Sequence, residues 1–193
     1  MLEPVTLEGE YVRLEPLSMD HLEGLCEVGL VPELWTWITH PVRTREDMQR
    51  YVQSAIDGRE RGEMMPFATV ERSSDRVVGC TRFGSINLPH KRMEIGWTWI
   101  APDWQRTFIN TEAKLLMLRY AFNDVGCNRV EWKTDALNER SRKAILRLGA
   151  RFEGTLRAHM QAEDGRLRDT VYYSALRDEW PDVERGLVEK MLR

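Results

Sequence analysis

The sequence contains few cysteines, and they form no group that would build a metal site or a covalent framework. Cys26, Cys80 and Cys127 are the three cysteines among 193 residues; they form no Cys-x-x-Cys pair, and none lies in a histidine-rich stretch. A disulfide framework needs paired cysteines, and structural zinc sites need closely spaced Cys and His ligands. The sequence therefore predicts reduced, mostly buried thiols and no metal.

The chain also lacks a long apolar segment and an excess of positive charge. No run approaches the roughly 18 apolar residues that a membrane span requires, and the first ten residues are acidic where a signal peptide would be basic. A formal net charge of −3 gives no strongly basic surface for nucleic acid or anionic lipid. We therefore expect a cytoplasmic protein that binds neither a membrane nor nucleic acid.

What the sequence does contain is a set of regularly patterned segments. A length of 193 residues with 42% hydrophobic content fits one domain, residues 1–193, without repeats or an interdomain linker. The apolar periodicities predict the order strand, helix, helix, three strands, helix, strand, helix, two strands, helix. This order predicts an α/β (α+β) fold with a mixed, mainly antiparallel sheet of six to seven strands and helices on both faces.

Polar residues next to the helical segments predict where helices begin and end. Ser18, Thr44 and Asn138 can each accept a backbone hydrogen bond at a helix start, and Asn110 or Thr111 can do so for the helix after the three central strands. Gly149 lies where the helix after Asn138 is expected to end. The Asp164-Gly165 pair predicts the turn of a hairpin over residues 151–176.

The polar segment after Pro102 is a candidate anion site because a long apolar helix follows it. Helix N-termini leave backbone N–H groups unpaired and carry partial positive charge, so a loop at a helix start can hold a phosphate. An ordinary connection between a strand and a helix explains the same segment equally well.

Five blocks in fixed order decide between these interpretations: EGEYVRLEPLSMDHLEGL, EIGWTWIAPDWQ, NTEAKLLMLRYAF, NERSRKAILRLGARFEG and LRDTVYYSALRDEW. Their order and spacing resemble the GNAT superfamily of acyl-CoA-dependent N-acetyltransferases, and in particular its RimJ/RimL branch, which acetylates α-amino groups of ribosomal proteins. The resemblance extends over nearly the whole chain. It implies the GNAT fold, acetyl-CoA as cosubstrate, and direct transfer of the acetyl group to an amine without a metal or a covalent enzyme intermediate.

The resemblance also implies which residues hold acetyl-CoA. The segment from Gln105 to Asn110 would wrap the pyrophosphate, with Phe108 and Asn110 at positions where the superfamily has small residues. We expect Phe108 to narrow the site or to pack beside the cofactor, and Arg106 to add a charge-assisted contact. The backbone of Trp99 to Ala101 would face the thioester. The cofactor-binding residues implied are Trp99, Ile100, Gln105, Arg106, Thr107, Phe108, Ile109, Asn110, Asn138, Ser141 and Lys143.

The chemistry needs a neutral amine, donors for the developing oxyanion and a proton for the leaving thiolate. The resemblance makes Ser141 a proton donor to the sulfur, and a partly buried Glu94 could accept the amine's proton with its pKa raised by desolvation. The alternative for Ser141 is an exposed serine without a catalytic role, beside an Asn138 that only caps the helix. The alternative for Glu94 is a strand glutamate paired with Arg82 or Arg92. Ile145 occupies the position where many relatives have a tyrosine that protonates the thiolate, so this chain cannot use that tyrosine.

The acceptor is left open by the sequence. A protein N-terminal α-amino group is favoured, with an antibiotic or polyamine as an alternative and a degenerate CoA-binding or partner-binding domain as another. His159 and Tyr173 fall on the hairpin that lines the acceptor cleft in relatives, and four tryptophans at 35, 37, 97 and 99 could line it or belong to the core. A homodimer is possible, since dimers are common in the branch.

Overall fold

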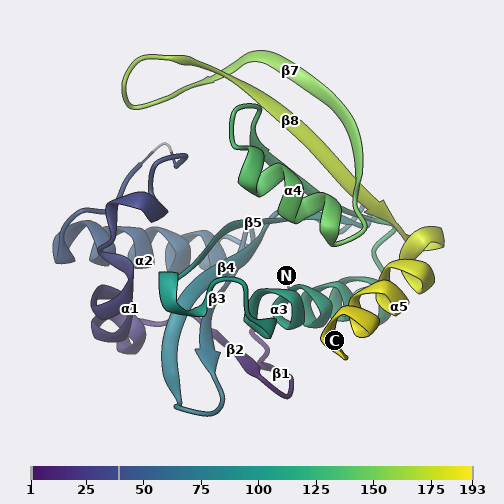
Figure 1. Cartoon of the computed structure of the whole chain (residues 1–193), viewed down its shortest axis with the longest axis horizontal. Coiled ribbons are helices and arrows are strands. Elements are labelled where there is room, and N and C mark those ends of the chain that lie inside the picture. Colours follow the sequence, from purple (N-terminus) through teal and green to yellow (C-terminus); the bar gives the residue numbers. More distant parts are fainter. Residues whose placement is uncertain (1, 39, 193) are drawn as a thin grey trace.

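The centre of the protein is a single mixed sheet (Figure 1), seen in a computed structural model that describes residues 2–38 and 40–192. Within these residues eight strands lie in the order β1-β2-β3-β4-β5-β6-β8-β7. Their bounds are β1 (Leu7–Glu8), β2 (Val12–Pro16), β3 (Met65–Glu71), β4 (Arg76–Asn87), β5 (Arg92–Ile100), β6 (Arg129–Asp135), β7 (Arg151–Gln161) and β8 (Leu167–Leu176). The prediction of six to seven strands missed β1, because two residues are too few to show an alternating pattern.

Five helices cover the sheet: α1 (Leu22–Gly29), α2 (Arg45–Glu60), α3 (Phe108–Arg119), α4 (Glu139–Arg147) and α5 (Trp180–Met191), as counted over the described part of the chain. Short 3₁₀ turns occupy Met19–His21, Pro32–Leu34, Pro102–Trp104 and Arg177–Glu179, and a π-helical turn, Tyr120–Asp124, continues α3. One buried cluster packs α3, α4 and α5 against the sheet, and a second packs α1 and α2. The predicted placement of helices on both faces is confirmed.

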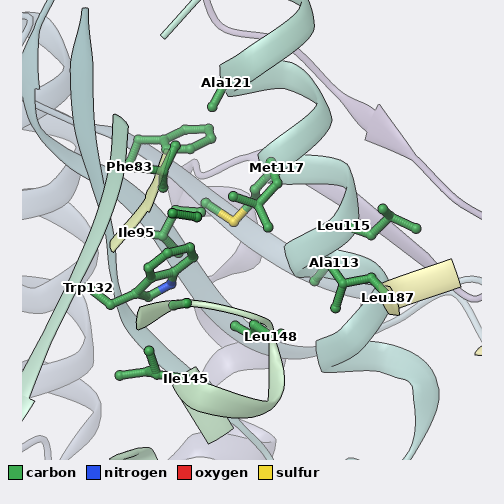
Figure 2. Close-up of a cluster of buried hydrophobic side chains, with 14 of the residues drawn as sticks. Phe83, Ile95, Ala113, Leu115, Met117, Ala121, Trp132, Ile145, Leu148 and Leu187 are labelled. Atoms are coloured by element: carbon green, nitrogen blue, oxygen red, sulfur yellow. The ribbon is translucent and has the colours of Figure 1, made fainter. Parts of the chain in front are cut away.

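Residues of the central strands alternate between these two clusters. Phe67 of β3 belongs to the cluster under α3, whereas Ala68 belongs to the cluster under α1 and α2. The alternation follows because successive side chains of a strand point to opposite faces. Figure 2 shows Phe83 of the sheet gathered with Met117 of α3 and Ile145 of α4 in the first cluster.

Three of the predicted helix starts are confirmed by their hydrogen bonds. Ser18, Thr44 and Asn138 accept backbone N–H groups from the first turns of their helices, at 3.3, 3.1 and 3.0 Å. Gly149 follows the last turn of α4 with a φ of 95°, a left-handed conformation that glycine adopts without steric cost.

The predicted start of α3 is wrong. Thr107, and not Asn110 or Thr111, caps this helix by accepting the N–H of Ile109 at 3.3 Å. The loop before α3 is therefore shorter than predicted, and Phe108, Ile109 and Asn110 form the first helical turn. Thr107 caps the helix because its hydroxyl can accept the hydrogen bond and its backbone is extended, as the capping position requires.

The strands β5 and β6 are the only neighbours that run parallel in the described sheet, and they pair over a short length. Their register joins Arg92 to Arg129, Met93 to Val130 and Glu94 to Glu131. β5 then continues to Ile100 and β6 to Asp135 without further pairing between them among the described residues. The two strands therefore part after Glu94 and Glu131.

Candidate active site

A bulge in β5 lies just beyond the point where β5 and β6 part. Gly96 pairs with Arg82 and Trp99 pairs with Cys80, so Trp97 and Thr98 lie opposite a single residue of β4. Trp97 takes up the extra residue with a φ of 50°, which bulky side chains rarely adopt. The bulge leaves the Thr98 side chain exposed on the α3 face of β5.

The loop before α3 contains one left-handed residue, and it is Arg106, with a φ of 65°. Phe108 and Asn110 adopt helical backbone instead, which suits any side chain, so neither position requires the glycine that the superfamily pattern favours. The Phe108 ring packs against Tyr11 at a centroid distance of 5.1 Å. Asn110 presents a buried side-chain oxygen that has no hydrogen-bond partner within residues 2–38 and 40–192.

The starts of α3 and α4 lie next to each other. Gln105 donates to the carbonyl of Ile100 at 2.7 Å and accepts from Arg140 in the first turn of α4. Further along, Arg147 of α4 donates to Thr111 of α3 at 3.3 Å. Figure 1 shows α4 between α3 and the hairpin of β7 and β8. Two helix N-termini thus bring their unpaired N–H groups to the end of β5, which favours a bound anion.

The predicted cofactor residues of α4 occupy its first turns. Asn138 uses its side-chain oxygen to accept the N–H of Ser141, so its NH₂ group remains for another partner. Ser141 is half-buried, and Lys143 is exposed beside Glu139 at 3.4 Å. Ile145 belongs to the buried cluster under α4. Whether Asn138, Ser141 and Lys143 also contact acetyl-CoA stays a prediction.

Glu94 is 3% exposed and lies on β5 at the last residue paired with β6. Its carboxylate lies 2.9 Å from the ammonium of Lys133 and accepts a hydrogen bond from Ser85 at 3.2 Å. The alternative of a strand glutamate paired with Arg82 or Arg92 is wrong in its partner, because Lys133 of the neighbouring strand forms the ion pair and Arg92 pairs with Glu131. The other carboxylate oxygen lies over Gly96, where any Cβ would approach it to 3.1 Å.

A buried guanidinium completes this face of the sheet. Arg82 lies between the rings of Tyr51 and Trp97, at 4.7 and 5.2 Å from their centroids, and one of its terminal nitrogens has no partner among the described residues. Lys133 lies 5.9 Å from the Trp97 ring. Neither Tyr51 nor Lys133 belongs to a sequence motif, so no local signal marks them as site residues. Packing of α2 on the sheet brings Tyr51 to Arg82, and strand pairing brings Lys133 to Glu94.

A cavity of about 330 Å³ lies between the α1–α2 connection and the hairpin tip. Its lining residues are Pro32, Trp35, Thr36, Trp37, Ile38, Pro41, Val42, Arg43, Asp135, Ala162, Glu163, Asp164, Arg166 and Arg168. Arg43 pairs with Glu163 at 2.8 Å, and Arg166 with Asp135 at 2.6 Å. Arg168 is buried, and its Nε has no hydrogen-bond partner in the described residues. Burial lowers the pKa of Arg168, opposed by Asp135 and, more weakly, by Glu94.

The other suspected acceptor residues separate into two groups. Trp37 lines the cavity and is exposed, Trp35 lines it and also belongs to the buried cluster under α1 and α2, and Trp99 lies in that cluster alone. Tyr173 is buried and accepts a hydrogen bond from Arg142 of α4 at 3.2 Å, so it supports α4. His159 is exposed and lies 6.1 Å from the ring of Tyr172.

The cysteines are free thiols, with Cys80 and Cys127 buried and Cys26 half-buried. Burial raises the pKa of Cys80 to about 12, which keeps it protonated and unreactive. In residues 2–38 and 40–192 no three His, Cys, Asp or Glu side chains gather as metal ligands. No helix in the same described ranges has the length and apolar character to span a membrane.

Comparison with known proteins agrees with this geometry. Residues 12–151 match the family model described as Acetyltransferase (GNAT) domain. The uncharacterized N-acetyltransferase p20 of Bacillus licheniformis is 27% identical over 176 residues, covering 91% of this chain and 98% of p20. YdaF of Bacillus subtilis, provisionally named a ribosomal N-acetyltransferase, is 33% identical over 104 residues, covering 54% and 56%.

Solved structures show the same fold. The crystal structure of a GCN5-related N-acetyltransferase from Brucella melitensis superposes with a TM-score of 0.92 at 32% identity, covering 98% of this chain and 86% of that one. The structure of Mycobacterium smegmatis RimJ in complex with CoA-disulfide superposes with a TM-score of 0.82 at 22% identity, covering 97% and 95%. At that identity the likeness to RimJ concerns the fold.

Proposed function

Because the chain belongs to the GNAT family of N-acetyltransferases, we propose that it transfers the acetyl group of acetyl-CoA to the α-amino group of a protein N-terminus. One observation carries the proposal: β5 and β6 part beside two adjacent helix starts. The backbone from Trp99 to Ala101 does not pair with β6 and would face the thioester, and the helix starts favour the pyrophosphate.

Each part of acetyl-CoA has candidate partners in this chain. The N–H groups of the first turn of α3 and the side chain of Arg106 would contact the pyrophosphate, and Lys143 the 3′-phosphate. The free NH₂ of Asn138 is a donor of the kind that the amide carbonyls of pantetheine match. These contacts are proposals, as are the roles of Gln105, Thr107 and Phe108.

The transfer itself needs a proton acceptor and a proton donor. The amine nitrogen bonds to the thioester carbon, and the carbonyl electrons move to oxygen and return to expel the thiolate. Glu94 would accept the proton that the amine loses, directly or through water, and Ser141 would give a proton to the thiolate. Ser141 then regains a proton from solvent and Glu94 releases one to solvent, so the enzyme returns to its starting state. Lys133 holds the Glu94 carboxylate in place at 2.9 Å.

The proposed acceptor follows from the cavity between the α1–α2 connection and the hairpin tip. The residues that line it include Trp35, Trp37 and Asp135. Asp135 lies two residues along β6 from Lys133, the partner of Glu94, so the cavity is near the proposed proton acceptor. A chain terminus can enter such a cavity, and an α-amino group with a pKa of about 7.7 to 8.0 is partly neutral at physiological pH. The provisional name of YdaF, a ribosomal N-acetyltransferase, supports a macromolecular acceptor.

The test is acetylation of paired peptides by the wild-type protein. A peptide with a free N-terminus and a blocked lysine should gain one acetyl group by mass spectrometry, and the same peptide with a blocked N-terminus and a free lysine should not. Titration calorimetry with acetyl-CoA provides the binding control. Failure to bind acetyl-CoA would overturn the whole proposal, and acetylation of lysine alone would overturn the acceptor assignment.

A second candidate acceptor is a small amine that carries a carboxylate. Arg43 and Arg166 in the cavity wall each have a carboxylate partner, whereas the buried Arg168 has no hydrogen bond at Nε among the described residues. A cavity of about 330 Å³ also suits a small ligand. If this candidate holds, free amino acids will be acetylated faster than their amides, and Arg168→Gln will raise KM for the amino acids alone.

A further inference from the structure

Lys114 of α3 is 3% exposed, yet it has no carboxylate partner within residues 2–38 and 40–192. Its ammonium donates to the hydroxyl of Thr81 at 2.7 Å and to the hydroxyl of Thr98 at 2.8 Å, and lies 4.0 Å from the sulfur of Met117. A buried charge without a counter-ion costs stability, and burial lowers the pKa of Lys114 to about 7. Such a residue is a candidate for a functional role.

The two hydroxyls and the ammonium form a closed triangle. Thr81 and Thr98 lie 2.8 Å apart, so one of them donates to the other, while Lys114 donates to both. The Thr81 hydroxyl can donate to Thr98 at 2.8 Å or to the sulfur of Met117 at 3.6 Å, and oxygen at the shorter distance is the stronger acceptor. When Thr81 donates to Thr98, the two lone pairs of Thr98 are filled by Lys114 and Thr81. The proton of Thr98 then points to a partner outside the triangle, where only the distant carbonyl of Gly96 at 3.4 Å competes for it within the described chain.

The position of Thr98 gives this arrangement a use. Thr98 belongs to the bulge of β5, its side chain is exposed, and it lies beyond the last residue that pairs with β6. It also directly precedes the backbone segment that the proposed function places at the thioester. A hydroxyl that accepts from an ammonium is a stronger donor, because hydrogen bonds in a chain polarise one another.

We propose that Lys114 is a positioning residue that orients and polarises the Thr98 hydroxyl, and that Thr98 donates a hydrogen bond to the thioester oxygen as negative charge develops on it. The inference rests on the proposed function, because it places the thioester beside Thr98. The hydroxyl keeps its proton throughout, so the proton balance of the transfer is unchanged. A donor that is held in place by the hydrogen bonds behind it stabilises the oxyanion more than the ground-state carbonyl.

Replacement of Lys114 separates this role from a structural one. Lys114→Met removes an unpaired buried charge and leaves the bond between Thr81 and Thr98, so the variant is expected to fold and to melt at or above the wild-type temperature. We expect its kcat to fall about tenfold with the KM for acetyl-CoA within about twofold, and Thr98→Val to lose about 10²-fold, because it lacks the donor itself. Thr98→Ser should recover most of the loss. Lys91→Met, an exposed lysine outside the site, is the matched control.

A spectroscopic readout makes the test independent of the acceptor. With acetyl-CoA labelled by ¹³C at the thioester carbonyl, infrared difference spectra of the bound ligand report hydrogen bonding to that oxygen. We expect a lower carbonyl stretching frequency in the wild type than in water, and a return toward the water value in Lys114→Met and Thr98→Val.

The outcomes separate this inference from the proposed function. A wild-type protein that does not bind acetyl-CoA overturns both. A wild-type protein that binds and transfers, with Lys114→Met unchanged in kcat and in carbonyl frequency, overturns the role of Lys114 alone. Loss of kcat in Lys114→Met together with a lower melting temperature and a raised KM would show a structural lysine and would also overturn it.

Discussion

The carboxylate of Glu94 on β5 lies 2.9 Å from the ammonium of Lys133 on β6. The contact joins the two parallel strands at the last residue pair before they part, and it holds a buried acid at the opening of the site. Arg82, which the sequence offered as a partner of Glu94, instead lies between Tyr51 and Trp97. Arg92 pairs with Glu131 at 3.3 Å.

Glu94→Gln tests the assignment of the proton acceptor. The amide keeps the shape of the side chain and cannot accept the amine's proton, so kcat should fall about 10²-fold while acetyl-CoA affinity is unchanged. Steady-state kinetics and calorimetry measure the two effects. Lys133→Met is the comparison, because it leaves a buried carboxylate unpaired and should lower the free energy of unfolding by about 1–3 kcal/mol. A Glu94→Gln variant with wild-type kcat would rule out the base.

Two substitutions at Asn138 separate helix capping from cofactor binding. Asn138→Ala removes the oxygen that accepts the N–H of Ser141 and should cost about 1 kcal/mol of stability. Asn138→Ser keeps a capping oxygen and lacks the NH₂ group. If that NH₂ group contacts acetyl-CoA, calorimetry will show weakened binding in both variants, while denaturant unfolding will show a loss of stability mainly in Asn138→Ala. Wild-type affinity in Asn138→Ser would leave Asn138 as a cap.

Arg106 combines a left-handed backbone with a charge in the loop before α3. Arg106→Gly and Arg106→Ala lose the same guanidinium, but only glycine relieves the backbone, so Arg106→Gly should be more stable than Arg106→Ala by about 1 kcal/mol. Both variants should bind acetyl-CoA more weakly than the wild type. The difference in affinity between the wild type and each variant should decrease at high salt, because salt screens the charge of Arg106. Equal affinity of all three proteins would show that Arg106 does not contact phosphate.

Lys114 should give the protein a stability that rises with pH. Its pKa is lowered from 10.5 to about 7 in the folded state, so between about pH 7 and 10.5 the unfolded chain binds more protons than the folded one. Stability therefore increases with pH across that window and is least below it. The groups that face its ammonium are Thr81 of β4, Thr98 of β5 and Met117 of α3, and none of them is charged. Urea unfolding between pH 6 and 10 should show that the free energy of unfolding rises less with pH in Lys114→Met than in the wild type. Some rise remains in the variant, because other groups also titrate. Parallel curves for the two proteins would contradict the prediction.

Much of the fold could be predicted because local patterns carry it. The alternating residues of the strand at 129–135 and the caps at Ser18, Thr44 and Asn138 agree with the structure. The start of α3 could not be fixed, because several neighbouring polar residues have the chemistry of a cap and the backbone around Thr107 decides among them.

The sequence by itself determined the order of elements, both helical layers and the family, since these depend on periodicity and on motifs that lie close together in the chain. Only the tertiary structure decided which charges meet. Lys133 reaches Glu94 through the pairing of β5 with β6, and Lys114 reaches Thr81 and Thr98 through the packing of α3 on the sheet. The partners of Lys133 and Lys114 lie 16 to 39 residues away in sequence, so no local sequence pattern predicts these contacts.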